Sequence, residues 1–174
     1  MATDFFELAE RRFSVRSYTD APVEQDKLDM ILEAGRIAPT ANNQQPQRVY
    51  VLKSKEALKK LDSITPMRYG APIVFLFTYD KNKSWASAPG GDPYDAGGMD
   101  VCIICTHMML EAENLGLGTL WVRYFNADQV KKTFDLPDNE VVMCMLCLGH
   151  KAPGAKPSGS HSCNKPLSET VTYL

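Results

Sequence analysis

The feature that most constrains the fold of this chain is the apolar segment from Gly98 to Asn114, which reads G-M-D-V-C-I-I-C-T-H-M-M-L-E-A-E-N. Between Val101 and Leu110 its apolar side chains would surround most of the axis of a helix. Such a helix must be covered by other parts of the protein. The sequence therefore predicts a central, buried helix that also contributes to a subunit interface. We expect His107 to be a hydrogen-bonded core or interface residue rather than a catalyst.

Further helices and strands are predicted on both sides of this segment. Helical spacing and capping residues predict helices over residues 4–12, 24–38, 54–62 and 126–134. Apolar, β-branched runs predict strands over residues 48–53, 71–79, 118–125 and 140–149. In the second helix we expect a buried stripe that consists of Leu28, Ile31, Leu32 and Ile37. With no internal repeat, residues 1–174 are expected to form a single domain.

The C-terminal part of the chain has a different composition. Residues 150–174 are rich in Pro, Gly and Ser and cannot build a core of their own. We expect an extended arm that packs on the domain or on a partner subunit.

Charge and hydropathy exclude several classes of protein. The formal net charge is -2 and the pI is about 5.9, so a general nucleic-acid surface is disfavoured. No apolar run reaches the roughly 18 residues that a membrane-spanning helix needs. The N-terminal residues also lack the basic-then-apolar pattern of a signal peptide. We therefore expect a cytoplasmic protein without a membrane or nucleic-acid partner.

Four of the five cysteines form two C-x-x-C pairs, Cys102/Cys105 and Cys144/Cys147. This spacing can belong to a zinc site. Here, however, the first pair lies in the predicted central helix, and the second lies in a predicted strand where positions i and i+3 face opposite sides. We expect small buried thiols and no metal.

The segment R-R-F-S-V-R-S-Y-T-D, residues 11–20, is dense in hydrogen-bond donors. On an extended backbone Arg12, Ser14 and Arg16 would point to one side, with Phe13 and Val15 on the other. Guanidinium groups and hydroxyls are suited to a phosphate monoester. The segment therefore indicates an anion site, although a solvated basic turn has the same pattern. There is no G-x-G-x-x-G or G-x-x-x-x-G-K-[ST] element elsewhere that would bind a phosphate.

Two loops carry further polar or aromatic residues. Residues 38–47, A-P-T-A-N-N-Q-Q-P-Q, offer amides that can bind the edge of a planar heterocycle or connect the loop to itself. Residues 81–94 form a long loop that is either a functional lid or disordered. Trp85 in this loop could cover an aromatic ligand or anchor the loop to its own domain.

Four segments together resemble the FMN-dependent nitroreductase family. They are R-R-F-S-V-R-S-Y, A-P-T-A-N-N-Q-Q-P, H-M-M-L-E-A-E-N-L-G-L-G-T-L-W-V and K-P-L, and they occur in the family's order. The resemblance implies an α+β fold of the nitroreductase type, in which helices wrap a central mixed or antiparallel sheet. It also implies an intertwined homodimer with one FMN in each of two interface clefts.

The resemblance assigns flavin contacts to specific positions. By analogy, Arg12 and Ser14, with Phe13 between them, match positions that hold the phosphate and ribityl chain, and Arg16 matches the basic residue near N1 and O2. Residues that match a segment from the other subunit, including that loop's amides, are Pro39, Thr40, Ala41, Asn43 and Gln45. Residues whose backbone matches the contacts to the N5/O4 edge are Val122, Arg123 and Tyr124. Lys165 matches a C-terminal phosphate ligand.

The implied activity is hydride transfer from NAD(P)H through flavin N5 to a nitroaromatic, quinone or flavin acceptor. In such an enzyme the cofactor performs the chemistry, so no catalytic side chain is expected beyond a flavin-tuning role for Arg16. Two departures from the family pattern matter: Arg123 and Tyr124 replace smaller residues, which predicts a narrower or more polar pocket, and Lys165 is the only C-terminal basic ligand. The alternative is an FMN-binding dimer without turnover, acting as a flavin carrier or redox sensor.

Overall fold

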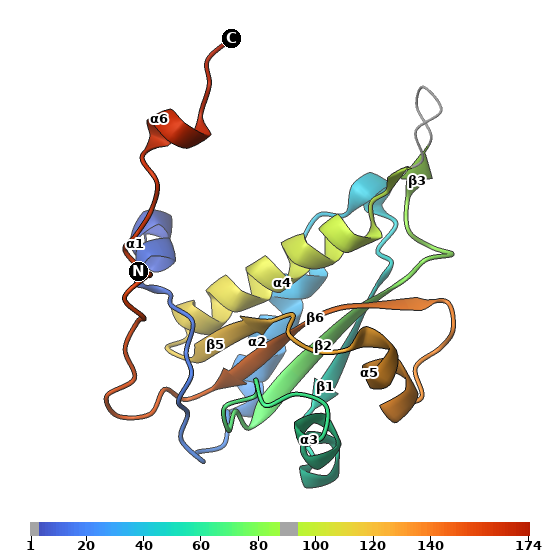
Figure 1. Ribbon diagram of the computed structural model, residues 1–174, viewed down its shortest axis with the longest axis horizontal. Helices are drawn as coiled ribbons and strands as arrows, with labels where there is room; N and C mark the ends of the chain where they lie inside the picture. The colour runs from blue at the N-terminus through green and yellow to red at the C-terminus, as the bar shows by residue number, and fades with distance from the viewer. Residues whose placement is uncertain (1–3, 88–93) are drawn as a thin grey trace.

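The computed structural model describes residues 4–87 and 94–174, which form an α+β fold around a four-stranded antiparallel sheet (Figure 1). The strand order is β1-β2-β6-β5. The strand bounds are β1 Gln47–Leu52, β2 Ile73–Asp80, β5 Gly118–Val122 and β6 Glu140–Gly149. β2 and β6 are the inner strands, and nearly all of their residues are buried because helices cover both faces of the sheet.

One face of the sheet is covered by helices α2 (Gln25–Arg36) and α4 (Gly97–Asn114), which pack against each other (Figure 1). Phe75, Phe77 and Leu146 of the sheet contribute to this core. The predicted central helix is confirmed, since α4 contributes Val101, Ile104, Cys105, Met108 and Ala112 to the same cluster.

The opposite face is covered by α3 (Lys55–Asp62) and α5 (Ala127–Thr133). Leu61 and Val130 are their buried residues. Cys144 belongs to the first core and Cys147 to the second, so the prediction that these two cysteines face opposite sides of the strand is confirmed. The five described cysteines are all free thiols.

Local sequence signals determine where the helices begin and end. The side chains of Asp4, Ser54 and Asn126 accept hydrogen bonds from the first-turn amides of α1 (Phe5–Arg11), α3 and α5. After α4, Gly116 has a φ of +79°, a left-handed conformation that favours glycine. These caps confirm the predicted helix ends to within about two residues.

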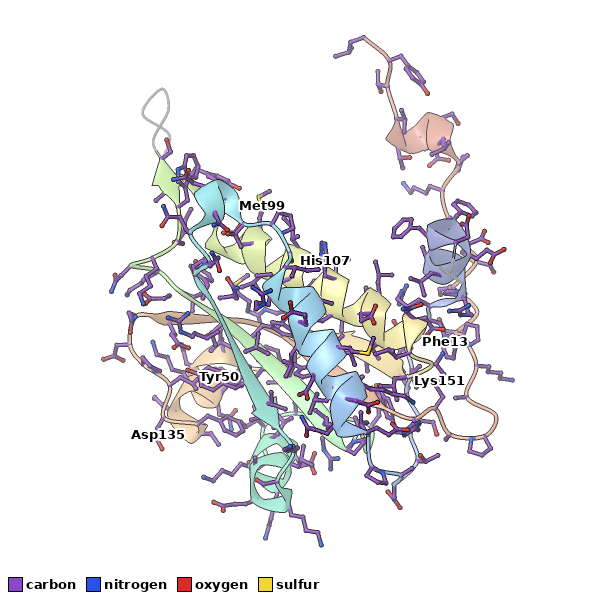
Figure 2. All side chains as sticks on the ribbon, turned by 180° about the vertical axis from the view of Figure 1, so that it is seen from behind. Phe13, Tyr50, Met99, His107, Asp135 and Lys151 are labelled. Carbon is purple, nitrogen blue, oxygen red and sulfur yellow. The ribbon has the colours of Figure 1, made fainter. Side chains whose placement is uncertain are left out.

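Two predictions about apolar side chains were too simple. Ile37 is 65% exposed. It follows Leu28 by nine residues, or about two and a half helical turns, which places it on the opposite side of α2 from the buried stripe. The central helix is also not covered on all sides, since Met99, Cys102, Ile103 and His107 are exposed. Met99, Ile103 and His107 are spaced four residues apart, with Cys102 next to Ile103, and the four residues form one stripe along α4, here called the α4 stripe. His107 lies at the middle of the helix, and its Nδ1 is 2.9 Å from the carbonyl oxygen of Ile103 (Figure 2).

The C-terminal residues form the expected extended arm. After β6 the chain runs past α1 and away from the sheet to the short helix α6 (Leu167–Thr170) (Figure 1). Leu167, Tyr173 and Leu174 are at least three-quarters exposed. An arm with so many exposed apolar side chains is consistent with packing on a partner, which stays a prediction.

The loop expected over residues 81–94 is not structureless at its ends. Strands β3 (Ala86–Ser87) and β4 (Tyr94–Asp95) pair antiparallel, and residues 88–93 between them lie outside the described residues. The rings of Trp85 and Tyr94 meet edge to face with centroids 6.3 Å apart. Trp85 therefore anchors the loop to itself.

Candidate functional site

The basic segment near the N-terminus lies against the edge strand β5. Ser14 forms a parallel bridge with Thr119, and the Val15 amide donates to the Thr119 carbonyl at 2.8 Å. Val15 is fully buried and Arg16 is exposed, as the predicted alternation requires. The approach is close because β5 begins with Gly118, where a Cβ would lie 2.8 Å from Val15 Cγ2. The segment is thus held in an extended form.

A polar hollow of about 670 Å³ lies at the amino-terminal end of this segment. Arg12 lines it together with three residues of α1 and three of the arm, which are Phe6, Ala9, Glu10, His161, Ser162 and Asn164. His161 is held by its Nε2, which lies 3.1 Å from the Glu10 carbonyl oxygen, and by an edge contact with the ring of Phe13. The guanidinium, hydroxyl, imidazole and amide groups are suited to an anion, and Glu10 is the one acidic residue among the described lining residues.

Lys165 does not line this hollow in the single chain. Its Nζ lies 3.5 Å from a Glu169 carboxylate oxygen, one turn further along the arm, and its side chain is 72% exposed. Its neighbour Asn164 lines the hollow instead.

A buried carboxylate pairs with two cationic side chains next to this hollow. Glu113, in the last turn of α4, is 3% exposed, and it accepts hydrogen bonds from Lys151 Nζ at 2.7 and 3.0 Å and from Arg11 Nε at 3.1 Å. The Lys151 ammonium also lies 5.3 Å from the centroid of the Phe13 ring (Figure 2). Sequence reasoning missed this network, because its members are far apart in the chain and lie in segments without a shared pattern.

A second, smaller pocket of about 130 Å³ lies at the other end of the segment. Arg16 lines it with the carboxyl end of β5 and the residues that follow, and with the turn before β2. The lining residues from those two places are Met67, Tyr69, Leu120, Trp121, Val122, Arg123 and Tyr124. The structure therefore brings Arg16 together with all three residues that were predicted to lie at the flavin edge. Met67 and Tyr69 were not predicted.

The walls of this pocket are held by specific contacts. The Thr65 hydroxyl donates to the Tyr124 carbonyl at 2.8 Å, which ties the turn to the end of β5. Arg68 holds the same turn to α3 through two hydrogen bonds to Asp62, at 2.5 and 2.7 Å. Arg123 lies over the ring of Phe125, with 4.9 Å from its guanidinium carbon to the ring centroid.

The amide-rich loop lies at the opposite end of α4 from Phe13 of the basic segment. It contains the 3₁₀ turn η1 (Ala41–Asn43), near the start of α4, whereas Phe13 lies near the end of that helix (Figures 1 and 2). The Ala41 amide donates at 2.8 Å to Asp100 Oδ1, a carboxylate that is 2% exposed. Within the chain, the loop residues therefore do not meet the basic segment.

Internal hydrogen bonds shape this loop. The backbone N–H of Gln45 donates to the Thr40 hydroxyl, and the side-chain Nε2 of Gln45 donates to Asn43 Oδ1, both at 3.1 Å. Asn42, Asn43 and Gln45 all have φ near +50°, a strained conformation that such contacts maintain. Pro39 precedes them in the same loop.

Two of the buried cysteines are poorly suited to metal or redox chemistry. Burial raises the pKa of the Cys147 thiol to about 12 and raises that of Cys105 well above its usual value. The thiolate, which binds metals and reacts with oxidants, is therefore disfavoured. Over residues 4–87 and 94–174 there is also no group of three or more His, Cys, Asp or Glu side chains that could hold a metal ion. Within the same ranges, no helix has the length and apolar character that crossing a membrane requires.

Known proteins provide an independent comparison. The family model described as "Nitroreductase family" matches residues 9–66 and 61–150. A crystal structure of a nitroreductase family protein from Clostridium difficile 630 is 40% identical, with a TM-score of 0.91 and coverage of 98% of both chains. The FMN reductase [NAD(P)H] of Bacillus subtilis is 31% identical over an alignment of 155 residues, with coverage of 80% of this chain and 62% of that protein.

A third comparison extends the similarity in fold. A protein from Exiguobacterium sibiricum, crystallised in complex with FMN, has a TM-score of 0.83 at 19% identity, with 100% of this chain and 99% of that chain covered. The α+β architecture, the order of the motifs and the family match over most of the chain agree with one another. This chain belongs to the nitroreductase family.

Proposed function

We propose that this protein is an FMN-dependent oxidoreductase that takes electrons from NAD(P)H and passes them to a small oxidised acceptor. The observation that carries the proposal is the position of Arg12 and Arg16 in one short extended segment. The first lines a polar hollow and the second lines an aromatic pocket. FMN has the same division, with a dianionic phosphate at one end and an aromatic ring at the other. The names of the relatives, an FMN reductase and NAD(P)H nitroreductases, support this assignment.

The donor groups at each end fit the cofactor. Arg12 and Ser14 would hold the phosphate and ribityl chain, and Lys165 would join them after a rotation about its flexible side chain. Val122, Arg123 and Tyr124 would offer backbone groups to the edge of the ring. No carboxylate side chain lines the pocket around Arg16, so its charge would be available to the flavin.

FMN, when bound, would supply the hydride and electron transfer, which explains why the proposal needs no nucleophile. The chain's own contribution is binding, orientation and charge. Arg16, near N1 and O2, would stabilise the negative charge that reduction places there. Trp121 and Tyr69 would exclude water from the ring by lining the pocket.

The proposal includes a homodimer. The loop that contains Pro39, Thr40, Ala41, Asn43 and Gln45 lies near the start of α4, whereas Phe13 of the basic segment lies near its end (Figure 2), so these residues would reach a flavin on the basic segment from another copy of the chain. A second copy, packed along the α4 stripe, would bring its loop to the partner's pocket. The two amide side chains that hold the loop together would then also present its backbone to the ring.

The test begins with protein purified under native conditions and then supplied with FMN. We expect a flavin absorbance spectrum, a rise in melting temperature on FMN addition, and bleaching of the bound flavin by NADH or NADPH under anaerobic conditions. A chain that binds no flavin by either measure contradicts the proposal.

One observation favours a second candidate, a flavin-binding dimer without turnover. Arg123 and Tyr124 line a pocket of only about 130 Å³, which could keep nicotinamide away from the ring. Stopped-flow mixing of the FMN-loaded protein with each nicotinamide separates the two candidates. Fast bleaching by either NADH or NADPH eliminates this one.

A further inference from the structure

The small pocket contains two cationic side chains. Arg16 and Arg123 both line it, and no Asp or Glu is among the other lining residues. Over the described part of the chain, neither guanidinium has a carboxylate oxygen within ion-pair distance. By contrast, Arg36 and Arg68 are each paired bidentately with an acid. The pocket therefore carries uncompensated positive charge.

Two contacts favour one position of the Arg123 side chain. Its guanidinium stacks on the Phe125 ring at 4.9 Å, and its Nη1 donates to the Phe125 carbonyl at 3.4 Å. The next residue, Tyr124, is tied through its carbonyl to Thr65, which is 2% exposed. A guanidinium held in this way loses less conformational entropy on binding a ligand than a free side chain does. Its remaining N–H groups are available to a carboxylate or sulfonate.

The other residues of the pocket wall indicate which kind of molecule carries the anionic group. Trp121, Tyr124 and Tyr69 offer aromatic surface beside the two guanidiniums. Such a wall favours a planar ring over an aliphatic chain. If the charge of Arg16 interacts with the flavin, as proposed above, the guanidinium of Arg123 is available to bind the electron acceptor that stacks on the flavin ring.

We infer that this enzyme prefers aromatic electron acceptors that carry a negative charge, and that Arg123 is the residue that selects them. The inference rests on the proposed function, because it concerns the acceptor of the same site. The reaction with a nitroaromatic acid balances as one nitro group, one NAD(P)H and one proton giving a nitroso group, NAD(P)⁺ and water. The anionic group takes no part in this exchange and serves only for recognition.

The experiment compares 4-nitrobenzoate with its neutral methyl ester as acceptors for the FMN-loaded protein. The quantity measured is the kcat/KM for 4-nitrobenzoate divided by the kcat/KM for the ester. The two compounds differ in how easily they are reduced, but this difference is the same for every variant, so it cancels when the ratios of two variants are compared. In Arg123→Gln we expect the ratio to fall about tenfold, and in Arg123→Lys to fall less, because the charge is kept but the fork geometry is lost. Added salt should lower the ratio of the native protein and have little effect in Arg123→Gln.

Lys132→Gln is the matched control, since it removes one exposed positive charge from α5, outside the pocket. The inference is overturned if the ratio is unchanged in Arg123→Gln, or if Lys132→Gln lowers it as much. It is also overturned if Arg123→Gln instead lowers the preference for NADPH over NADH, since the guanidinium would then bind the donor's phosphate. Flavin content and bleaching by NAD(P)H are recorded for every preparation. If the native protein binds no FMN, the proposed function is contradicted as well. If the protein binds FMN and NAD(P)H reduces it, but the ratio is unchanged in Arg123→Gln, only the preference for anionic acceptors is contradicted.

Discussion

Lys151 and Glu113 form an ion pair of 2.7 Å between the segment after β6 and the last turn of α4, at a carboxylate that is only 3% exposed. Glu113→Gln would leave both Lys151 and Arg11 without a charged partner in a partly buried site. We expect the free energy of unfolding to fall by about 2–3 kcal/mol, below the usual cost of breaking a fully buried pair because both cations reach solvent. Urea denaturation measures it. Glu33→Gln, which removes an exposed pair on α2, should have a much smaller effect.

The same variant should also separate the two ends of the proposed flavin site. Arg11 precedes Arg12, and Lys151 lies over Phe13, so loosening this network should disturb the phosphate end first. We expect Glu113→Gln to weaken FMN more than riboflavin, which lacks the phosphate. Equal weakening of both would mean that the network stabilises the fold without positioning the phosphate ligands.

Gly118 permits the close approach of the basic segment to β5. A Cβ at this position would lie 2.8 Å from Lys151 Cγ and 2.8 Å from Val15 Cγ2, and Val15 is fully buried. Gly118→Ala should therefore cost about 1–3 kcal/mol through overpacking, seen as a lower melting temperature. Gly159→Ala is the control, because a Cβ there would meet no atom within 4 Å. Similar melting temperatures for both variants would contradict this account of the contact.

Much of this fold could be predicted because its signals are local. The stripe of Leu28 and Ile31, the cap at Ser54 and the left-handed Gly116 are each visible within a few residues, and each was confirmed. Ile37 was grouped with this stripe, but nine residues after Leu28 the helix has made about two and a half turns, so Ile37 lies on the opposite side and is exposed. A stripe is predicted correctly only if the helical period is counted along its whole length.

The site was partly predictable for the same reason. The alternation of Arg12, Ser14 and Arg16 is local, and the structure places the segment in the extended form that the alternation requires. The contribution of His161 to the Arg12 hollow depends on how the arm returns to α1, a contact 151 residues apart that no pattern in either segment records. Family resemblance supplied Val122 to Tyr124, and the structure placed them beside Arg16.

Tyr50 should make stability depend on pH in the alkaline range. Burial, and then its hydrogen bonds to the buried Glu140 carboxylate, raise the pKa of Tyr50 from 10.0 to about 12. Between these values the unfolded chain releases the phenolic proton and the native chain keeps it, so stability falls as the pH rises. We expect Tyr50→Phe to remove about 1–2 kcal/mol of that loss, measured by urea denaturation across the window.

The alkaline loss should not vanish in Tyr50→Phe, because burial also raises the pKa of Tyr18. Tyr173→Phe serves as the control, since that side chain is 95% exposed and should leave the slope unchanged. A pH profile of Tyr50→Phe that is parallel to that of the native protein would contradict the prediction.

The α4 stripe should control both assembly and flavin binding. Ile103 is 36% exposed at its centre, and a charge there would have to be desolvated if a second copy packed on it. We expect Ile103→Asp to shift the protein toward monomer in light scattering and to lower FMN affinity, since the loop from Pro39 to Gln45 would no longer reach the pocket. Gln129→Asp, an exposed position on α5, should change neither. A monomeric variant that binds FMN normally would show that each chain completes its own site.

Arg12 and Arg16 should have different effects on the same cofactor. Arg12 lines the polar hollow, so Arg12→Ala should weaken FMN about 10- to 100-fold, the size of a lost charge-assisted contact, with little change for riboflavin. Arg16 lines the aromatic pocket, so Arg16→Ala should mainly lower the reduction potential of the bound flavin, because a positive charge near N1 and O2 favours the reduced anion.

The expected drop for Arg16→Ala is about 20–40 mV, since about 1.4 kcal/mol corresponds to 30 mV for a two-electron couple. Fluorescence titration gives the affinities, and dye-coupled reduction gives the potential. Arg48→Ala is the control for losing an arginine elsewhere, because Arg48 lies on β1 and lines neither the hollow around Arg12 nor the pocket around Arg16. The assignment of the two roles fails if Arg12→Ala weakens riboflavin as much as FMN, or if Arg16→Ala leaves the potential unchanged. Either result would mean that the flavin does not lie along the segment with its phosphate toward Arg12 and its ring toward Arg16.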